Sequence, residues 1–252
     1  DRGLVGSEMC IRDRLKINSL RLAKASDSLP PAQRVFLDVL PLLFHLNHIA
    51  LPGYSSAETP IGVHDLKIDR NHIKAARSIA KSFNLDRGTT KPPTADIRSI
   101  FLMGSCGSLG HNENSDFDIW IVPHNGLDAQ QTTALDKKCT AIAKWAHELG
   151  LEAHFFIMDD KQFREQQRAN MNKEDCGTTQ HYLLLDEFYR TCILVAGCQP
   201  MWWHVPPSHE ANYSETVQQL CDNRFVRSEE CIDFGSTHKI CLLYTSDAAD
   251  DQ

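Results

Sequence analysis

Residues 97–122, IRSIFLMGSCGSLGHNENSDFDIWIV, contain the pattern on which the fold prediction depends. The apolar run Ile100–Met103 predicts a short strand, which Gly104–Ser105 ends. A loop rich in glycine, serine and asparagine follows, and the chain then returns as a second strand from Asp116 to Ile121. The stretch therefore predicts a strand, a glycine loop and a second strand.

The second strand carries two acids at alternate positions. Side chains two residues apart on a strand point to the same side, so Asp116 and Asp118 share one face. Two adjacent carboxylates repel each other and favour a bound cation, for which Mg²⁺ is the natural choice. The turn at Gly104–Ser105 offers backbone N–H groups and a hydroxyl to a polyphosphate. A lone Gly-Ser pair is usually a turn and a lone D-x-D a solvated face, but the two together predict metal-phosphate chemistry.

Composition sets broad limits on the class of protein. The chain has 252 residues and a formal net charge of −7, which argues against broad nucleic-acid binding. No apolar run reaches the roughly 18 residues that a membrane span needs. The nine cysteines include no C-x-x-C pair, so neither a zinc knuckle nor a disulfide framework is expected. We expect a protein of the reducing cytoplasm.

Both ends of the sequence have an unusual character. Leu4–Arg14 reads LVGSEMCIRDR and Cys241–Asp251 reads CLLYTSDAADD. Both resemble translated adapters from sequencing libraries, and the alternative is an ordinary N-terminal helix and a polar tail. We therefore set residues 1–14 and 241–252 aside from the fold prediction, as is done for tags. On this interpretation the natural protein continues beyond both ends.

Residues 15–95 are predicted to form an N-terminal helical segment. Apolar residues recur at helical spacing in 15–25 and 68–83, and residues 32–47 form an unusually apolar helix. Prolines and glycines separate these helices, and a polar stretch with two prolines leads into the strand pattern. The segment would form a helical layer in front of the sheet.

A long helix and a third strand should follow the two acids. Asp128 is a plausible N-cap for a helix over 129–149, and Gly150 a plausible C-cap. A strand over 151–158 would place Glu152 and His154 on one face. Glu152 could then be a third metal-binding carboxylate or a general base, and the alternative is a solvent-facing glutamate.

The remaining chain gives a weaker pattern. It predicts helices over 161–170 and 178–196, a strand over 201–205, and short helical pieces after residue 208. We take 96–207 as the catalytic core and 208–240 as the start of a truncated helical region.

Several motifs together resemble a known family. The Gly-Ser loop followed by D-x-D is similar to the signature of the polymerase-β-like nucleotidyltransferase superfamily. The wider set resembles the amino-terminal catalytic region of class I adenylate cyclases of gammaproteobacteria, through MGSCGSLGHNENSDFDIWIV at 103–122, LGLEAHFFIMDDKQFR at 149–164, DCGTTQHYLLLDEFYRT at 175–191 and WWHVPP at 202–207. The resemblance implies an α+β fold, a small mixed sheet flanked by helices with an N-terminal helical layer.

The resemblance also implies an activity. ATP would be converted to 3′,5′-cyclic AMP and pyrophosphate by in-line attack of the 3′ hydroxyl, with two Mg²⁺ ions, or Mn²⁺, as cofactors. It implies metal binding by Asp116, Asp118 and Glu152, and nucleotide contacts from Gly104, Ser105, Ser108 and Trp120. Trp120 lies on the aspartate face by strand alternation, and packing against a helix is its alternative role.

Two departures from the family pattern stand out. Related sequences carry a lysine after the Ala-Gly that follows the LLLDEFYRT helix, whereas this chain reads Gly197–Gln199 as Gly-Cys-Gln. Arg190 and Lys91 are the alternative phosphate contacts. The family also continues into a regulatory region, on which partners from the sugar phosphotransferase system are expected to act, and that region is absent here.

Three functions stay open on the sequence alone. The first is an adenylate cyclase catalytic fragment. The second is another nucleotidyltransferase that modifies RNA, a protein or a small molecule. The third is an ATP-binding fragment without turnover.

Overall fold

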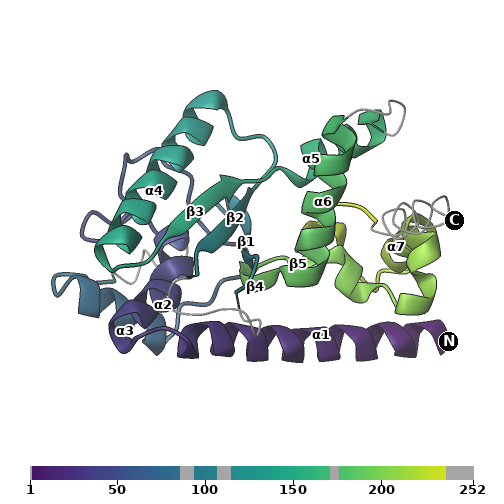
Figure 1. Ribbon diagram of the computed structural model, residues 1–252, viewed down its shortest axis with the longest axis horizontal. Helices are drawn as coiled ribbons and strands as arrows, with labels where there is room; N and C mark the ends of the chain where they lie inside the picture. The colour runs from purple at the N-terminus through teal and green to yellow at the C-terminus, as the bar shows by residue number, and fades with distance from the viewer. Residues whose placement is uncertain (1, 86–93, 107–114, 171–175, 237–252) are drawn as a thin grey trace, which may run out of the picture. The chain divides into compact units, whose positions relative to one another are not determined.

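The computed structural model describes residues 2–85, 94–106, 115–170 and 176–236 of the chain (Figure 1). Two of the residues predicted to contact nucleotide, Lys91 and Ser108, lie outside these ranges. The chain divides into two compact units. One unit comprises 20–159 and 193–197, and the other comprises 1–19, 160–192 and 198–252. The domain boundaries predicted from the sequence, at residues 95 and 207, stay predictions.

The first unit is built on a four-stranded mixed sheet. Its strands are β1 (Ile97–Met103), β2 (Phe117–Pro123), β3 (Ala153–Ile157) and β4 (Ile193–Gly197), in the order β3-β2-β1-β4. β1 pairs antiparallel with β2 and β4, and β2 pairs parallel with β3. The parallel pair requires a crossover, which the long helix α4 (Ala129–Glu148) supplies. The two predicted strands and the turn at Gly104–Ser105 are confirmed, and residues 107–114 of the predicted loop lie outside the described residues.

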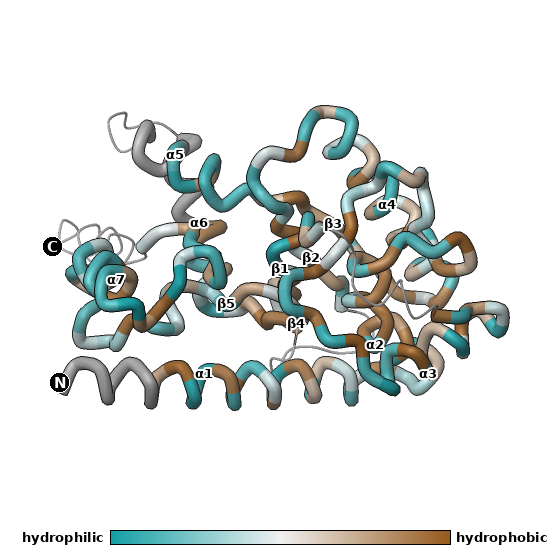
Figure 2. The backbone as a smooth tube through the Cα atoms, turned by 180° about the vertical axis from the view of Figure 1, so that it is seen from behind, coloured by the Kyte–Doolittle hydropathy of each residue, from teal (hydrophilic) through white to brown (hydrophobic). Residues whose placement is uncertain are grey.

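Helices α2 (Pro31–His45) and α4 bury one face of this sheet (Figure 1). The ring of Phe36 on α2 lies 6.1 Å from that of Phe117 on β2 and 5.9 Å from that of Trp145 on α4. α2 is apolar along most of its length (Figure 2), so it contributes more buried side chains than an amphipathic surface helix would. This unit also contains the end of α1 (Arg2–Asp27) and α3 (Arg70–Ile79), which is shorter than predicted.

The predicted N-cap of α4 is confirmed, and the C-cap is Leu149, one residue before the predicted Gly150. The Asp128 side chain accepts from the backbone N–H of Gln131, and the Gln131 side chain accepts from the backbone N–H of Asp128. This capping box satisfies two donors that the helix itself cannot pair. Gly150, with φ of 79°, follows the last turn and directs the chain into β3.

The second unit has a smaller core. It contains α5 (Asp160–Asn170), α6 (Cys176–Thr191), α7 (Tyr213–Asp222) and the strands β5 (Gln199–Pro200) and β6 (Cys231–Ile232). Short 3₁₀ helices η1 (Met201–His204), η2 (Pro207–Asn212) and η3 (Ser228–Glu230) connect them. One cluster of its buried residues comprises Met201, Val205, Tyr213, Leu220, Val226 and Cys231. Within the described residues no helix is both long and apolar enough to cross a membrane.

Two secondary-structure predictions were wrong. The helix predicted over 178–196 ends at Thr191, and Ile193–Gly197 forms β4. This run is rich in β-branched and aliphatic residues, and pairing with β1 provides hydrogen bonds that a longer helix would not. The strand predicted over 201–205 is instead the 3₁₀ helix η1, in which the Val205 N–H donates to the Trp202 carbonyl at 3.1 Å.

Candidate metal and nucleotide site

The two aspartates lie where β2 begins beside the end of β1. Asp118 pairs in register with Met103, the last residue of β1, and Asp116 lies just before the strand. Asp116 is exposed and Asp118 is half-buried, whereas Phe117 between them is fully buried. The alternation predicted from the sequence is therefore confirmed.

Gly104 makes the turn after β1 possible. Its φ of 72° lies in the left-handed region, which residues with a Cβ adopt at a cost of about 1–2 kcal/mol. Ser105 follows and is exposed. The Gly-Ser turn therefore ends β1 close to the aspartates, as the sequence predicted.

Strand β3 brings Glu152 and His154 to the aspartates. The backbone N–H of Phe117 donates to the Glu152 carbonyl at 2.8 Å, and Asp118 pairs in register with His154. One donor atom from each of Asp116, Glu152 and His154 lies within 4.8 Å of the others. The predicted proximity of Glu152 to the acid pair agrees with this geometry. The sequence placed His154 on the same face and gave it no role.

Burial and a neighbouring negative charge both disfavour the ionised form of Asp118. Partial burial raises the pKa of the Asp118 carboxyl, the nearby His154 lowers it, and the negative charge of Asp116 raises it again. A positive ion in this place would offset both the desolvation and the repulsion.

The cluster has a donor set suited to a divalent cation. Carboxylate oxygens are ligands for Mg²⁺ and Mn²⁺, and imidazole nitrogen is a ligand for several transition metals. An ion that lies about 2.1 Å from two donor atoms can bridge atoms up to about 4.2 Å apart. The three donor atoms of the cluster lie within 4.8 Å of one another on exposed side chains, so a small side-chain movement would bring them into range. The residues present therefore fit a divalent cation.

Cys106 is a neighbour of the site that sequence reasoning missed. Its side chain is fully buried directly after the Gly-Ser turn, and its Sγ donates to the Asp116 carbonyl at 3.9 Å. Burial, followed by the charge of Asp118, raises the pKa of this thiol to about 12. Cys106 therefore acts as a small apolar anchor between the turn and β2. Its position directly after the Gly-Ser turn was the one available signal.

Two further residues predicted to contact the nucleotide, Trp120 and Arg190, lie in different surroundings. Trp120 is 4 % exposed and pairs in register with Phe101 and Phe156, so a role at the nucleotide stays a prediction. Arg190 lies in the other unit, where its Nε is 2.8 Å from a carboxylate oxygen of Asp186 one helical turn away. Arg190 thus has an ion-pair partner on its own helix. The phosphate contact predicted for Arg190 stays a prediction.

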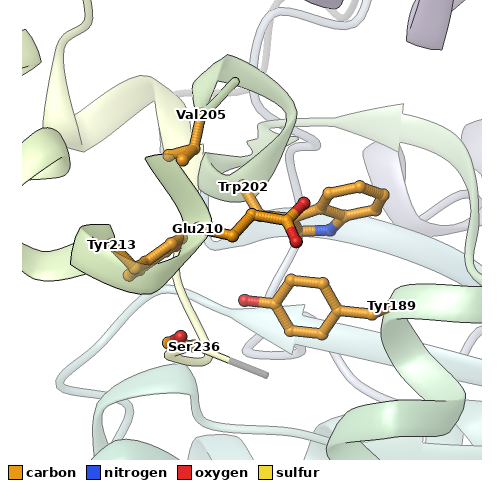
Figure 3. Close-up of a pocket in the computed structure, with 6 residues that line it drawn as sticks. All are labelled: Tyr189, Trp202, Val205, Glu210, Tyr213 and Ser236. Carbon is orange, nitrogen blue, oxygen red and sulfur yellow. The ribbon is translucent and has the colours of Figure 1, made fainter. Parts of the chain in front are cut away.

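A small pocket in the second unit is lined partly by aromatic side chains. Its walls include the rings of Tyr189 and Trp202, 5.0 Å apart, with the Glu210 side chain beside them (Figure 3). The Arg14 guanidinium lies 4.6 Å from the centre of the Trp202 ring and donates to the Val205 carbonyl at 3.1 Å. A side chain of the chain itself thus occupies the aromatic surface that a ligand would use.

Comparison with known proteins decides the family. The family described as "Adenylate cyclase NT domain" matches residues 8–203. The chain belongs to this family. The adenylate cyclases of Salmonella typhimurium and Escherichia coli K12 are both 35% identical to it over 223 residues, which is 87% of this chain and 26% of each relative. The chain thus spans about a quarter of the length of the curated relatives it matches.

The solved structures give a much weaker likeness. A toxin-antitoxin structure, MntA-HpeT mutant D39ED41E, has 10% sequence identity and a TM-score of 0.27 over 61% of this chain and 88% of that one. A likeness of this size carries no argument here. The interpretation of residues 1–14 and 241–252 as adapter sequence stays a prediction.

Proposed function

We propose that the chain is the catalytic region of an adenylate cyclase and converts ATP to 3′,5′-cyclic AMP and pyrophosphate. The observation that carries the proposal is the convergence of Asp116, Glu152 and His154, with Asp118 beside them, next to the Gly-Ser turn. Membership of the adenylate cyclase N-terminal domain family supports the choice of reaction.

Each side chain has a distinct task in this proposal. Asp116 and Asp118 hold the divalent cation, and the Gly104–Ser105 turn donates hydrogen bonds to the β- and γ-phosphates. Glu152 accepts the proton of the 3′ hydroxyl as the 3′ oxygen bonds to the α-phosphorus. The bond from the α-phosphorus to pyrophosphate breaks in the same step. A bound Mg²⁺ supplies charge neutralisation at the phosphate oxygens.

We also propose that the sheet unit is a polymerase-β-like nucleotidyltransferase core. What supports this is an antiparallel strand pair joined through a Gly-Ser loop, with D-x-D at the start of the second strand and a third carboxylate from a parallel neighbour. A cytoplasmic location and control through the sugar phosphotransferase system are proposals for the parent enzyme on family grounds.

The proposal is tested by chromatography of the products formed from ATP and Mg²⁺. We compare the wild-type chain with the double variant Asp116→Asn/Asp118→Asn, which keeps side-chain size and removes both charges. Wild type should form cyclic AMP, and the double variant should lose at least about 100-fold in rate, since its cation ligands are gone. Asp136→Asn, an exposed position on α4, is the matched control and should behave as wild type.

The same experiment separates the alternatives. AMP attached to an acceptor, without cyclic AMP, would favour another nucleotidyltransferase. Equal absence of turnover in wild type and double variant, with ATP still bound by wild type, would favour the binding fragment.

A further inference from the structure

His154 is the one member of the cluster that the proposed mechanism does not use. We propose that His154 binds the divalent cation directly through nitrogen, so that the site accepts a transition-metal cation and not Mg²⁺ alone. The inference rests on the proposed function, because it concerns the same metal site, and it adds both a ligand and a metal preference.

Strand geometry places the imidazole in the site. His154 and Glu152 are two residues apart at β3, so both side chains point to the same face. The parallel register with β2 sets His154 opposite Asp118. This ladder holds His154 at the acid pair through backbone hydrogen bonds, independently of any ion.

The imidazole lies close enough to the carboxylates to share a cation with them. Its Nε2 lies 3.3 Å from a carboxylate oxygen of Glu152, and a donor atom of the ring shares the 4.8 Å cluster with Asp116 and Glu152. The side chains of His154 and Glu152 are 49% and 64% exposed. An ion pair this exposed contributes little to stability, so a purely stabilising role gives a weak account of the arrangement.

The chemistry of the donors sets the metal preference. Mg²⁺ prefers oxygen ligands in octahedral geometry, whereas imidazole nitrogen adds affinity for first-row transition cations. A site with two or three carboxylates and one imidazole therefore binds Mn²⁺ or Co²⁺ more tightly than the same carboxylates alone. Because His154 acts through nitrogen, replacing it should affect those cations far more than Mg²⁺.

Electron spin echo modulation on Mn²⁺ added to the 252-residue chain tests the ligand directly. Wild type should show coupling to a directly bound ¹⁴N nucleus, and His154→Gln should lose it. The Mn²⁺ dissociation constant should rise about tenfold or more in His154→Gln, while that for Mg²⁺ changes less than about threefold. His124→Gln, an exposed histidine just beyond β2, is the matched control and should keep both the coupling and the affinity. A second variant, His154→Asn, and far-ultraviolet circular dichroism check that the loss does not come from unfolding.

Several results would overturn the inference. These are no ¹⁴N coupling in wild type, coupling that survives in both His154 variants, equal weakening of Mn²⁺ and Mg²⁺, or no Mn²⁺ binding. Product chromatography reports separately on the proposed function. Cyclic AMP formation without nitrogen coupling removes only the His154 ligand, and nitrogen coupling without cyclic AMP removes only the proposed reaction.

Discussion

Single residues fix the geometry of the site through backbone conformation and burial. Gly104 adopts a left-handed φ that ends β1, and Cys106 is buried two residues later. The Cys106 thiol reaches the Asp116 carbonyl, so the start of the loop and the start of β2 are tied together. At this scale the site depends on one glycine and one buried thiol as much as on its carboxylates.

The buried environment of the Cys106 thiol predicts that this thiol is alkylated slowly. A thiol with a pKa of about 12 has roughly a thousandfold less thiolate at pH 8 than one at the ordinary value of 9.0. Burial and nearby carboxylates also raise the pKa of Cys221, which is partly exposed, so we expect iodoacetamide to label Cys106 of the native chain at least about tenfold more slowly than Cys221. Peptide mapping by mass spectrometry measures both rates. In denaturant the two should react alike, and equal labelling in the native chain would contradict the burial.

At the scale of elements, β4 completes the sheet through a close approach. Gly197 ends β4 with φ of 99°, and a Cβ at this position would lie 2.1 Å from the Arg98 carbonyl oxygen. β4 comes from a segment about 70 residues after β2, yet it pairs with β1 on the side away from β2. The sheet around the site thus depends on a contact that no local pattern specifies.

The energetic effect of the close approach at Gly197 can be measured against a second glycine with a similar backbone conformation. Gly126 has a similar φ of 105°, but a Cβ there meets nothing within 4 Å. We expect Gly126→Ala to lower the free energy of unfolding by about 1–2 kcal/mol from backbone strain alone. Gly197→Ala should cost at least about 2 kcal/mol more, since β1 and β4 must separate and weaken their hydrogen bonds. Denaturant unfolding measures both, and equal losses would mean that the close approach is absent.

At the scale of the whole molecule, a buried lysine joins distant segments of the sheet unit. Lys138 on α4 is 1 % exposed, and its Nζ donates to the carbonyls of Leu46 and Gly53, both at 3.4 Å. Leu46 caps the end of α2, and Gly53 lies in the loop after it. Among the described residues, no salt bridge to a carboxylate includes this ammonium group.

Burial gives Lys138 a predictable effect on stability. Burial lowers its pKa from 10.5 to about 8. Between these values the unfolded chain holds a proton that the folded chain has released, so the contribution of Lys138 to the free energy of unfolding rises with pH. The full change is roughly 3 kcal/mol.

The lysine effect is measured as a difference between variants. The free energy of unfolding of wild type minus that of Lys138→Met should increase from pH 8 toward pH 10.5. The buried thiols titrate in the opposite sense, and both proteins keep them, so their contribution cancels except at Cys139, whose pKa Lys138 itself lowers. Lys137→Met, exposed on the same helix, should show no such pH-dependent difference. A difference in free energy of unfolding that does not change with pH would contradict the lowered pKa of Lys138.

Much of the sheet and the site could be predicted from local patterns. The alternation of Asp116 and Asp118 with buried neighbours, the glycine turn and the Asp128 cap all follow from rules that act over a few residues. The end of α6 and the strand β4 could not, because an aliphatic run such as Ile193–Ala196 suits either structure until a partner strand selects one.

The sequence by itself determined the Gly-Ser turn, the acid pair and the family, because each depends on residue identity at short spacing. Only the tertiary structure decided which groups join that pair. The parallel pairing of β2 with β3 brought Glu152 and His154 to Asp116, and the sheet and helices buried Cys106 and Lys138. Strand register and burial arise from contacts between segments far apart in the chain, and those contacts have no local signature.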